Sequence, residues 1–408
     1  MGFQQALSGL NAASRNLDVI GNNVANANTV GFKTSQAQFA DVFAASLAGA
    51  STNASGIGTR LAAVAQQFTQ GTITVSSNPL DMAINGSGFF RLSDNGTIKY
   101  SRNGQFFLDK DGYIVNSADM QLTGYTIDAA GNLDTASPQP LRLNTSDLSP
   151  VATTEMGGVL NLDSRSPIIA AAFDPTNPAT YNNSTSISVY DSLGNAHSMS
   201  LYFVKTGAGV WNVYGTLDGA AAAVTPSPLG TITFTSSGAI DTTATTLPFV
   251  ASLALTNGAV TPQPVDVDFT GTTQFGSGFS VNSLTQDGYT SGKLSGFSIS
   301  PDGVILGRYT NGRTSTLGQV VTANFTNPNG LIPMGGNTWV ESADSGTPLV
   351  GAPGSGNLGP VQSGAVEDSN VDLTAELVNM ITAQRVYQAN AQTIKTQDAV
   401  LQTLVNLR

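Results

Sequence analysis

The apolar residues at both ends of the chain follow a helical repeat. Near the N-terminus they recur at alternating three- and four-residue intervals, at Phe3, Ala6, Leu10, Ala13, Leu17, Ile20 and Val24. Near the C-terminus the same spacing connects Leu373, Leu377, Met380, Tyr387, Ala391, Ile394, Leu401 and Val405, and it is interrupted by Gln384 and Asp398. A sustained a/d repeat of this kind is typical of a coiled-coil seam. The pattern therefore predicts a helix at each end, with both helices suited to coiled-coil pairing.

Local signals place the bounds of these two helices. The first is predicted over residues 1–26, ending before the turn signal Asn28-Thr29-Val30-Gly31. The second is predicted to begin near Asp372, with Ser369 or Asp372 as its N-cap. Glu376 then falls in the first turn, where a negative charge suits the helix dipole. The alternative interpretation of the first helix is an ordinary helix that packs on a core.

The middle of the chain has the pattern of a β protein. Asn-Gly and Asp-Gly pairs between short apolar runs are strong hairpin cues. They occur at Asp94-Asn95-Gly96, Asn103-Gly104, Asp111-Gly112 and Asn311-Gly312. Three further strands are predicted at Ser184–Asp191, His197–Lys205 and Val210–Thr216. We expect mainly antiparallel β domains, built as barrels or sandwiches.

The order of these patterns predicts a multidomain α+β protein with nested domains. A chain of 408 residues exceeds the usual size of one domain. Residues 1–30 with 366–408 form a terminal coiled-coil domain, and residues 31–75 form an extended connector with weak strand character. Residues 76–148 with 286–362 form a discontinuous inner β domain. Residues 149–285 form an outer β domain inserted in it.

Composition and charge exclude several classes of function. The net charge of −11 argues against binding to nucleic acid. No run of about 18 apolar residues occurs, so we expect no membrane insertion. The first residues lack a basic region and an apolar run, so we expect no cleaved secretion signal. With no cysteine and one histidine, zinc–thiolate sites and cysteine nucleophiles are excluded.

Four motifs carry candidate chemistry, and each has a simpler interpretation. The G-x-G-x-x-G match at Gly354–Gly359 is flanked by prolines, which favours a flexible turn over a dinucleotide site. Asp109–Gly112 lacks the later ligands of a calcium loop and is interpreted as a hairpin turn. His197 has no second histidine or cysteine with which to share a metal, so a hydrogen-bonded strand residue is expected. Asp81 is expected to bond locally beside Asn78-Pro79. The sequence therefore predicts no catalytic residue, cofactor or metal site, and no enzyme activity.

Several long motifs carry a resemblance to a known family. They are Leu17–Asn26 followed by Thr29–Lys33, Leu80–Phe90 and Tyr100–Phe106 in the first β region, and Ser369–Ala391 near the C-terminus. Together these residues resemble the rod and hook family of bacterial flagellar axial proteins, most closely its hook members. The inserted middle region, with Tyr190–His197, favours hook over the shorter rod members. The N-terminal family motif corresponds to Asn22, Asn23, Asn26, Gly31, Phe32 and Lys33.

The resemblance implies a function and a set of partners. The chain would be a structural subunit that polymerises into the flagellar hook, the tubular, flexible universal joint that transmits torque from rod to filament. Its partners would be further copies of itself, the distal rod protein, the hook–filament junction protein, the hook cap and the flagellar type III export apparatus. It would be extracellular, in the flagellum. The alternatives are a distal rod or junction protein of the same family, or a secreted β-rich enzyme or adhesin.

The terminal repeat then becomes the expected contact between subunits. We expect Leu377, Met380, Ile394 and Leu401, along with Leu10, Leu17 and Ile20, to be buried only in the assembly. The residues of this inter-subunit coiled-coil seam are Phe3, Leu10, Leu17, Ile20, Val24, Leu373, Leu377, Met380, Tyr387, Ile394, Leu401 and Val405.

Overall fold

The computed structural model describes residues 2–42, 56–128 and 131–406, and the chain divides into two compact units. Unit 1 comprises Met1–Thr145, Gly296–Arg308 and Thr314–Arg408. Unit 2 comprises Ser146–Ser295 and Tyr309–Arg313. The chain therefore passes between the units four times, because the short segment 309–313 belongs to unit 2. The expected insertion, residues 149–285, is smaller than this unit.

Within the described residues, an α-helix stands near each end of the chain: α1 (Gly2–Ala25) and α2 (Leu373–Asn406). Both helices match the apolar repeat. The side chain of Asp372 accepts hydrogen bonds from the backbone N–H groups of Thr374 and Ala375, which makes Asp372 the N-cap of α2. The alternative cap, Ser369, bonds instead to the N–H of Val371, outside the helix.

The strands of unit 1 form one large branched sheet and three two-stranded sheets. They are β1 (Ser35–Val42), β2 (Gly58–Gln66), β3 (Ile73–Val75), β4 (Met82–Ile84), β5 (Phe89–Asp94), β6 (Thr97–Ser101), β7 (Phe107–Leu108), β8 (Ile114–Val115), β9 (Gln121–Ile127), β10 (Leu133–Pro140), β20 (Leu294–Ile299), β21 (Val304–Tyr309), β22 (Thr314–Val320), β23 (Thr322–Asn324), β24 (Ile332–Gly335), β25 (Thr338–Val340), β26 (Leu349–Gly351), β27 (Val361–Ser363) and β28 (Ala365–Glu367). The ends of β20 and β21 reach into unit 2.

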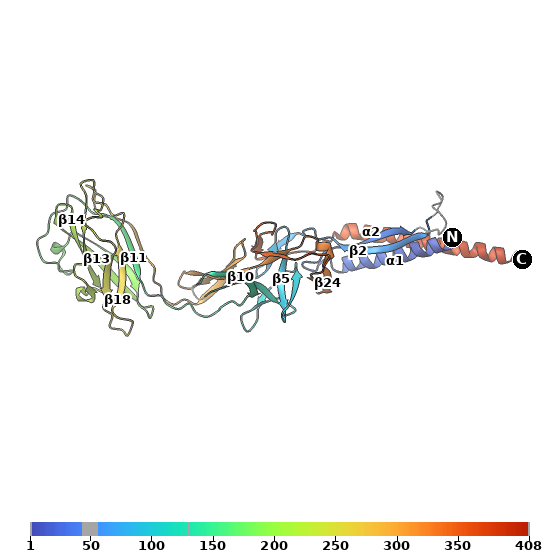
Figure 1. Ribbon diagram of the computed structural model, residues 1–408, viewed down its shortest axis with the longest axis horizontal. Coiled ribbons are helices and arrows are strands. Elements are labelled where there is room, and N and C mark those ends of the chain that lie inside the picture. The colour runs from blue at the N-terminus through green and yellow to red at the C-terminus, as the bar shows by residue number, and fades with distance from the viewer. Residues whose placement is uncertain (1, 43–55, 129–130, 407–408) are drawn as a thin grey trace. The chain divides into compact units, whose positions relative to one another are not determined.

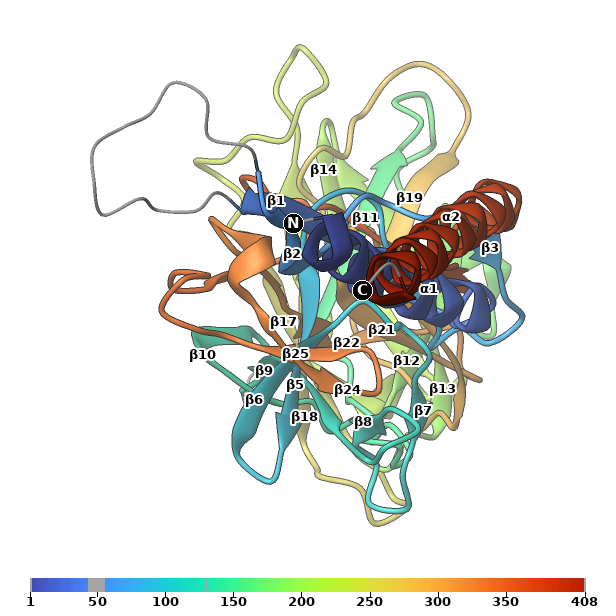
Figure 2. The same cartoon turned by 90° about the vertical axis from the view of Figure 1, so that its right-hand side faces the viewer.

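The described residues of the expected connector, 31–75, include an antiparallel pair of strands. β1 and β2 pair antiparallel from Ser35↔Gln66 to Val42↔Gly58 and pack on α1. Residues 43–55 of the predicted connector lie outside the described residues. Figures 1 and 2 show this hairpin beside the two helices, which themselves lie side by side.

The strands of unit 2 form two sheets of a sandwich. One has the order β15-β17-β18-β11-β19 and the other the order β12-β13-β14-β16. The bounds are β11 (Glu155–Asn161), β12 (Asn183–Tyr190), β13 (Ala196–Gly207), β14 (Val210–Leu217), β15 (Val224–Thr225), β16 (Gly230–Thr233), β17 (Phe249–Leu253), β18 (Gln263–Asp268) and β19 (Ser280–Gln286). The three strands predicted here from the sequence are confirmed as β12, β13 and β14.

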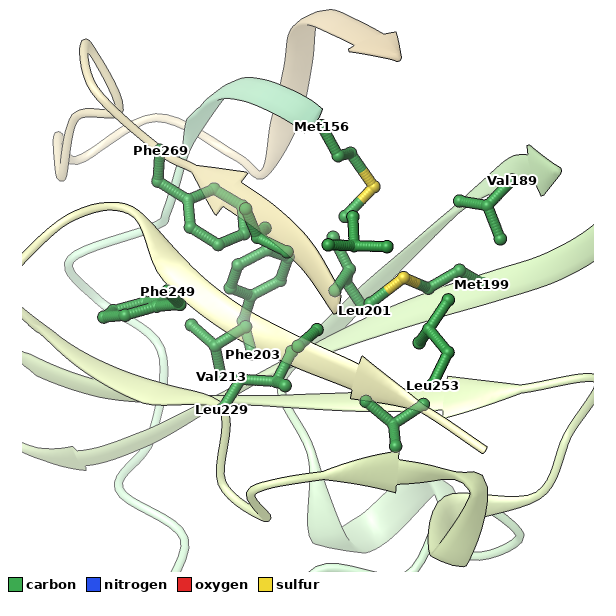
Figure 3. Close-up of a cluster of buried hydrophobic side chains, with 14 of the residues drawn as sticks. Met156, Val189, Met199, Leu201, Phe203, Val213, Leu229, Phe249, Leu253 and Phe269 are labelled. Atoms are coloured by element: carbon green, nitrogen blue, oxygen red, sulfur yellow. The ribbon is translucent and has the colours of Figure 1, made fainter. Parts of the chain in front are cut away.

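Side chains from both sheets of unit 2 meet in one core. Met199, Leu201 and Phe203 from β13 face Phe249 and Leu253 from β17, as Figure 3 shows. Alternate residues along each strand point inward, which is the period of a half-buried strand. No sheet among the described residues closes into a barrel, so the barrel form of the prediction is wrong and the sandwich form holds for this unit.

Two glycine-containing pairs that look alike in sequence serve different purposes. Asn95 and Gly96 both have positive φ and close the two-residue turn between β5 and β6, as predicted. Asn103-Gly104 is not a turn. Gly104 lies against β4, where an added Cβ would overlap the carbonyl oxygen of Met82. That glycine permits a close approach of two backbones.

Candidate functional site

Small residues lie along the helix pair formed by α1 and α2, which are in contact. Ala6, Ala13 and Ile20 of α1 are buried and recur every seven residues, and Ala383 of α2 is also buried. A Cβ on Gly9 would come within 2.9 Å of the Asn390 side chain, so the helices approach closely there. The first residues of α1 and the last turns of α2 lie at the same end of the helix pair, so the pair is antiparallel (Figure 1).

A groove lies along this helix pair. We call it the helix–hairpin groove: a cavity of about 620 Å³ lined by residues of α1, α2, β1 and β2. Its apolar lining includes Val19, Ile20, Phe39 and Val386, and Glu376 is the one charged residue among those that line it. The Glu376 Oε2 atom is buried and has no hydrogen-bond partner among the described residues.

The described seam residues divide into exposed, half-buried and buried groups in the single chain. Phe3, Leu373, Leu377, Tyr387 and Leu401 are exposed. Leu10, Leu17, Val24, Met380 and Ile394 are half-buried, whereas Ile20 is only 5% exposed. The side chain of Val405 lies outside the described part of the chain. Burial of Ile20 only in an assembly is therefore wrong, because this side chain already packs within the chain. The seam as a contact between subunits stays a prediction.

A buried ionic cluster joins the ends of both helices to the β part of unit 1. Lys33 Nζ lies 2.6 Å from Glu367 Oε1, and Arg102 Nη1 lies 3.0 Å from Glu367 Oε2. The Lys33 and Glu367 side chains are fully buried and that of Arg102 nearly so. Burial lowers the pKa of both Lys33 and Arg102, and Glu367 opposes that effect on each of them. One carboxylate thus balances two cations.

Further hydrogen bonds extend this cluster, which we call the junction. Lys33 Nζ donates to the Thr69 carbonyl, and Arg102 donates to the Gly86 carbonyl. Glu367 accepts the N–H of Gly71, and its own carbonyl accepts the N–H of Gly31. The junction therefore fixes where the chain leaves α1 and where it returns toward α2.

Two asparagines bind backbone groups beside the junction. Asn23 donates to the Ser35 carbonyl and accepts the Ser35 N–H, which holds the end of α1 against the start of β1. Asn370 accepts the Thr34 N–H and donates to the Gln67 carbonyl. A side-chain amide can satisfy an N–H and a C=O together, as a neighbouring strand would.

The family motif residues meet at or near this junction. Phe32 and Lys33 are buried, and Gly31 has a φ of 71° with Arg102 and Asn103 against it. Asn26 donates to the Asn22 carbonyl at the end of α1. No sequence pattern indicates that Arg102, Glu367 and Asn370 lie close together. Arg102 and Glu367 stand 265 positions apart in the chain, so no local spacing connects them.

The four motifs with candidate chemistry are structural. Gly354–Gly359 is a turn closed by a bond from the Gly354 N–H to the Gly359 carbonyl. Asp109 caps its own turn by accepting the N–H groups of Asp111 and Tyr113. Asp81 bonds to Ser76 and Asn78, which confirms the local role predicted for it. In residues 2–42, 56–128 and 131–406 no group of three or more His, Cys, Asp or Glu is arranged to hold a metal ion.

His197 lies between two carboxylates of unit 2. Its Nδ1 is 2.7 Å from Asp218 Oδ2, and its Nε2 is 3.3 Å from Asp191 Oδ2. Because both ring nitrogens face carboxylate oxygens, the doubly protonated ring fits this site best. Burial alone would lower the pKa of His197, but the hydrogen bonds and charges of Asp218 and Asp191 outweigh it and raise this pKa above 6.5.

The raised pKa predicts a pH dependence for the stability of unit 2. The stabilisation from His197 is fully present below the unfolded pKa of about 6.5 and is lost as pH rises through the higher folded pKa. We expect a loss of about 0.2–1 kcal/mol, the range measured for exposed ion pairs. The measurement is urea unfolding of the full chain at several pH values, followed by Trp211 fluorescence in a Trp339→Phe background. In His197→Gln the change above pH ~6.5 should disappear; an identical change in that variant would assign it to other groups.

Four stretches of the chain match known protein families. Residues 3–33 match the flagella basal body rod protein family, and residues 83–145 match the flagellar hook protein FlgE/F/G D1 domain. Residues 161–289 match the flagellar basal body protein FlaE D2 domain. Residues 362–407 match the flagellar basal body rod FlgEFG protein C-terminal family. Together they define an axial protein of the bacterial flagellum.

Relatives that match over their whole length show to which family of flagellar axial proteins the chain belongs. The chain is 44% identical to the flagellar hook protein FlgE of Escherichia coli K12 and 44% identical to that of Salmonella typhimurium, with all of this chain and all of each relative covered. It is 32% identical to the hook protein of Rhizobium meliloti, over all of this chain and 98% of that protein. The chain belongs to the flagellar hook protein family. It is a structural protein of the hook and not an enzyme.

A solved structure has a similar fold. The crystal structure of the Helicobacter pylori flagellar hook protein FlgE2 superposes with a TM-score of 0.52 over 71% of this chain and 99% of that chain. The two sequences are 14% identical, so this likeness concerns the fold. No helix in the described part of the chain combines the length and the hydropathy needed to span a bilayer.

Proposed function

We propose that this chain polymerises through its two terminal helices into the tube of the hook, the flexible joint between rod and filament. In this proposal α1 and α2 form the inner wall of the tube. The observation that carries it is the exposure of apolar side chains on α2. Leu377, Val378, Ile381, Val400 and Leu401 are each 48–59% exposed in the single chain.

Leu401 is the clearest example of an apolar side chain that the single chain leaves uncovered. It lies on the same seven-residue line of α2 as Met380, Tyr387 and Ile394. Met380 and Ile394 are half-buried, but Leu401 is 54% exposed. In an antiparallel pair the shorter α1 cannot cover this last part of α2. A second chain would bury it, and burying a leucine contributes about 1.5–3 kcal/mol.

The proposed partners follow from the position of the hook in the flagellum. They are the distal rod protein at one end of the tube, the hook–filament junction protein at the other, and the hook cap during growth. Export through the flagellar type III apparatus, without a cleaved signal, would bring the chain to the growing tip as an extracellular subunit. Isolated helices of this kind are marginal in water. We therefore expect the exposed apolar side chains of α2 to be buried only after export, when the subunits assemble.

Replacing Leu401 with aspartate tests the proposal. The exposed site tolerates the charge in the single chain, but in the polymer an unpaired carboxylate would be buried, at a cost of several kcal/mol. We expect secreted, folded subunits and no hooks by electron microscopy. Thr393→Asp is the matched control, because Thr393 is exposed and lies off the Met380–Leu401 line. Hooks of normal length in Leu401→Asp would contradict the proposal.

A further inference from the structure

The two sides of α2 differ in kind. At about 100° per residue, Leu377, Val378, Ile381 and Arg385 fall within an arc of about 100°. We call this set the outward face; all four residues are exposed. Ala383, Val386 and Asn390, which line the helix–hairpin groove, fall on the roughly opposite side of the helix. α2 thus carries an exposed apolar face on one side and forms one wall of the groove with the opposite side.

The charges on these two surfaces are complementary. Arg385 is the one cation of the outward face, and it makes no ion pair with any described residue. Glu376 is the one charged residue lining the groove, and its Oε2 is buried without a partner in the part of the chain that the structure describes. The helix dipole favours a carboxylate in the first turn of α2. It does not account for a carboxylate oxygen left unpaired inside a half-apolar groove, because a buried polar atom without a hydrogen-bond partner is unfavourable.

We propose that the helix–hairpin groove of one copy receives the outward face of α2 from a second copy, and that Arg385 of the second copy pairs there with Glu376. The inference rests on the proposed function, because it names the contact through which the copies polymerise. Val19, Ile20 and Phe39 of the groove supply the apolar wall for Leu377, Val378 and Ile381.

The positions of the outward face and the helix–hairpin groove on opposite sides of α2 determine the symmetry of the assembly. A contact between two different surfaces of the same protein is heterologous, and it repeats from copy to copy. Because the outward face and the groove lie on opposite sides of α2, each copy can be bound on both sides at once. Such a contact builds a ring or an open helical array of copies, and not an isologous dimer. This geometry suits a subunit of a tube.

A charge exchange tests the pair. The assay is polymerisation of the purified full-length chain at rising concentration, measured by sedimentation. Glu376→Arg and Arg385→Glu should each raise the critical concentration about tenfold or more, because each places like charges in the contact. The double variant Glu376→Arg with Arg385→Glu should return to within about threefold of the original chain, because the pair is restored with reversed signs. Circular dichroism checks that each variant keeps its helices.

The controls separate this inference from the proposed function. Glu376→Arg combined with Lys395→Glu should show no rescue, because Lys395 is also an exposed cation of α2 but lies nearly three turns beyond Arg385. Single variants that polymerise normally, or a double variant that is no better than the singles, would overturn the Glu376–Arg385 pair. Leu401→Asp tests polymerisation through the helices by itself. If a single variant loses its helices, the milder pair Glu376→Gln and Arg385→Gln replaces it, and additive effects there would also overturn the pair.

Discussion

Replacing Glu367 with alanine is expected to lower the free energy of unfolding of unit 1 by about 3–5 kcal/mol. The substitution leaves Lys33 and Arg102 buried with no opposite charge between them. It also leaves the Gly71 N–H without its acceptor. The loss is large because the cost of two buried cations remains after their counter-charge is removed. Lys33→Met should cost less, since Arg102 still neutralises Glu367.

The two tryptophans allow the free energy of unfolding of unit 1 to be measured in the full chain. Trp211 belongs to unit 2 and Trp339 to unit 1, and they are the only tryptophans in the sequence. In a Trp211→Phe background, urea unfolding followed by fluorescence reports on unit 1. Asp344→Ala is the matched control, because it removes an exposed carboxylate from the same unit. A midpoint in Glu367→Ala equal to that of the control would show that the junction does not stabilise unit 1.

Replacing Phe203 with alanine is expected to lower the free energy of unfolding of unit 2 by about 3–5 kcal/mol. The Phe203 ring is fully buried, and its centroid lies 5.7 Å from that of Phe269 and 6.1 Å from that of Phe279. Figure 3 shows it at the centre of the packed side chains of the sandwich. Removing the ring leaves a cavity that strands on both sides cannot fill without separating from their neighbours.

Trp211 fluorescence in a Trp339→Phe background measures this change. Val250→Ala is the control, because Val250 lies on β17 of the same unit with its side chain 53% exposed. We expect the control to change stability by less than about 0.5 kcal/mol. A Phe203→Ala chain that unfolds at the same urea concentration as Val250→Ala would contradict the assignment of this core.

The sequence predicts the regular elements well where one physical rule dominates. Seven-residue repetition of apolar residues indicates both helices, and Asp372 caps α2 as its side chain chemistry allows. Alternation and turn residues predict β12, β13, β14 and the turn at Asn95-Gly96. In each case the decisive interactions lie within a few residues of one another along the chain.

Features that depend on distant partners could not be predicted in the same way. Lys33 looks like an ordinary surface lysine until the fold places Glu367, 334 positions away, against it. Asn103-Gly104 has the letters of a turn, yet Gly104 is required for a close approach to Met82. Ile20 belongs to the apolar repeat, but only the packing of α1 on α2 and the hairpin decides that it is buried in the single chain.

The most direct measurement is a helical reconstruction by electron cryomicroscopy of hooks assembled from this chain. We expect the terminal helices to form the inner wall, with Leu377, Val378, Ile381 and Leu401 of each copy buried against neighbouring copies. A tube in which these side chains face solvent, and in which copies touch only through unit 2, would contradict assembly through the terminal helices.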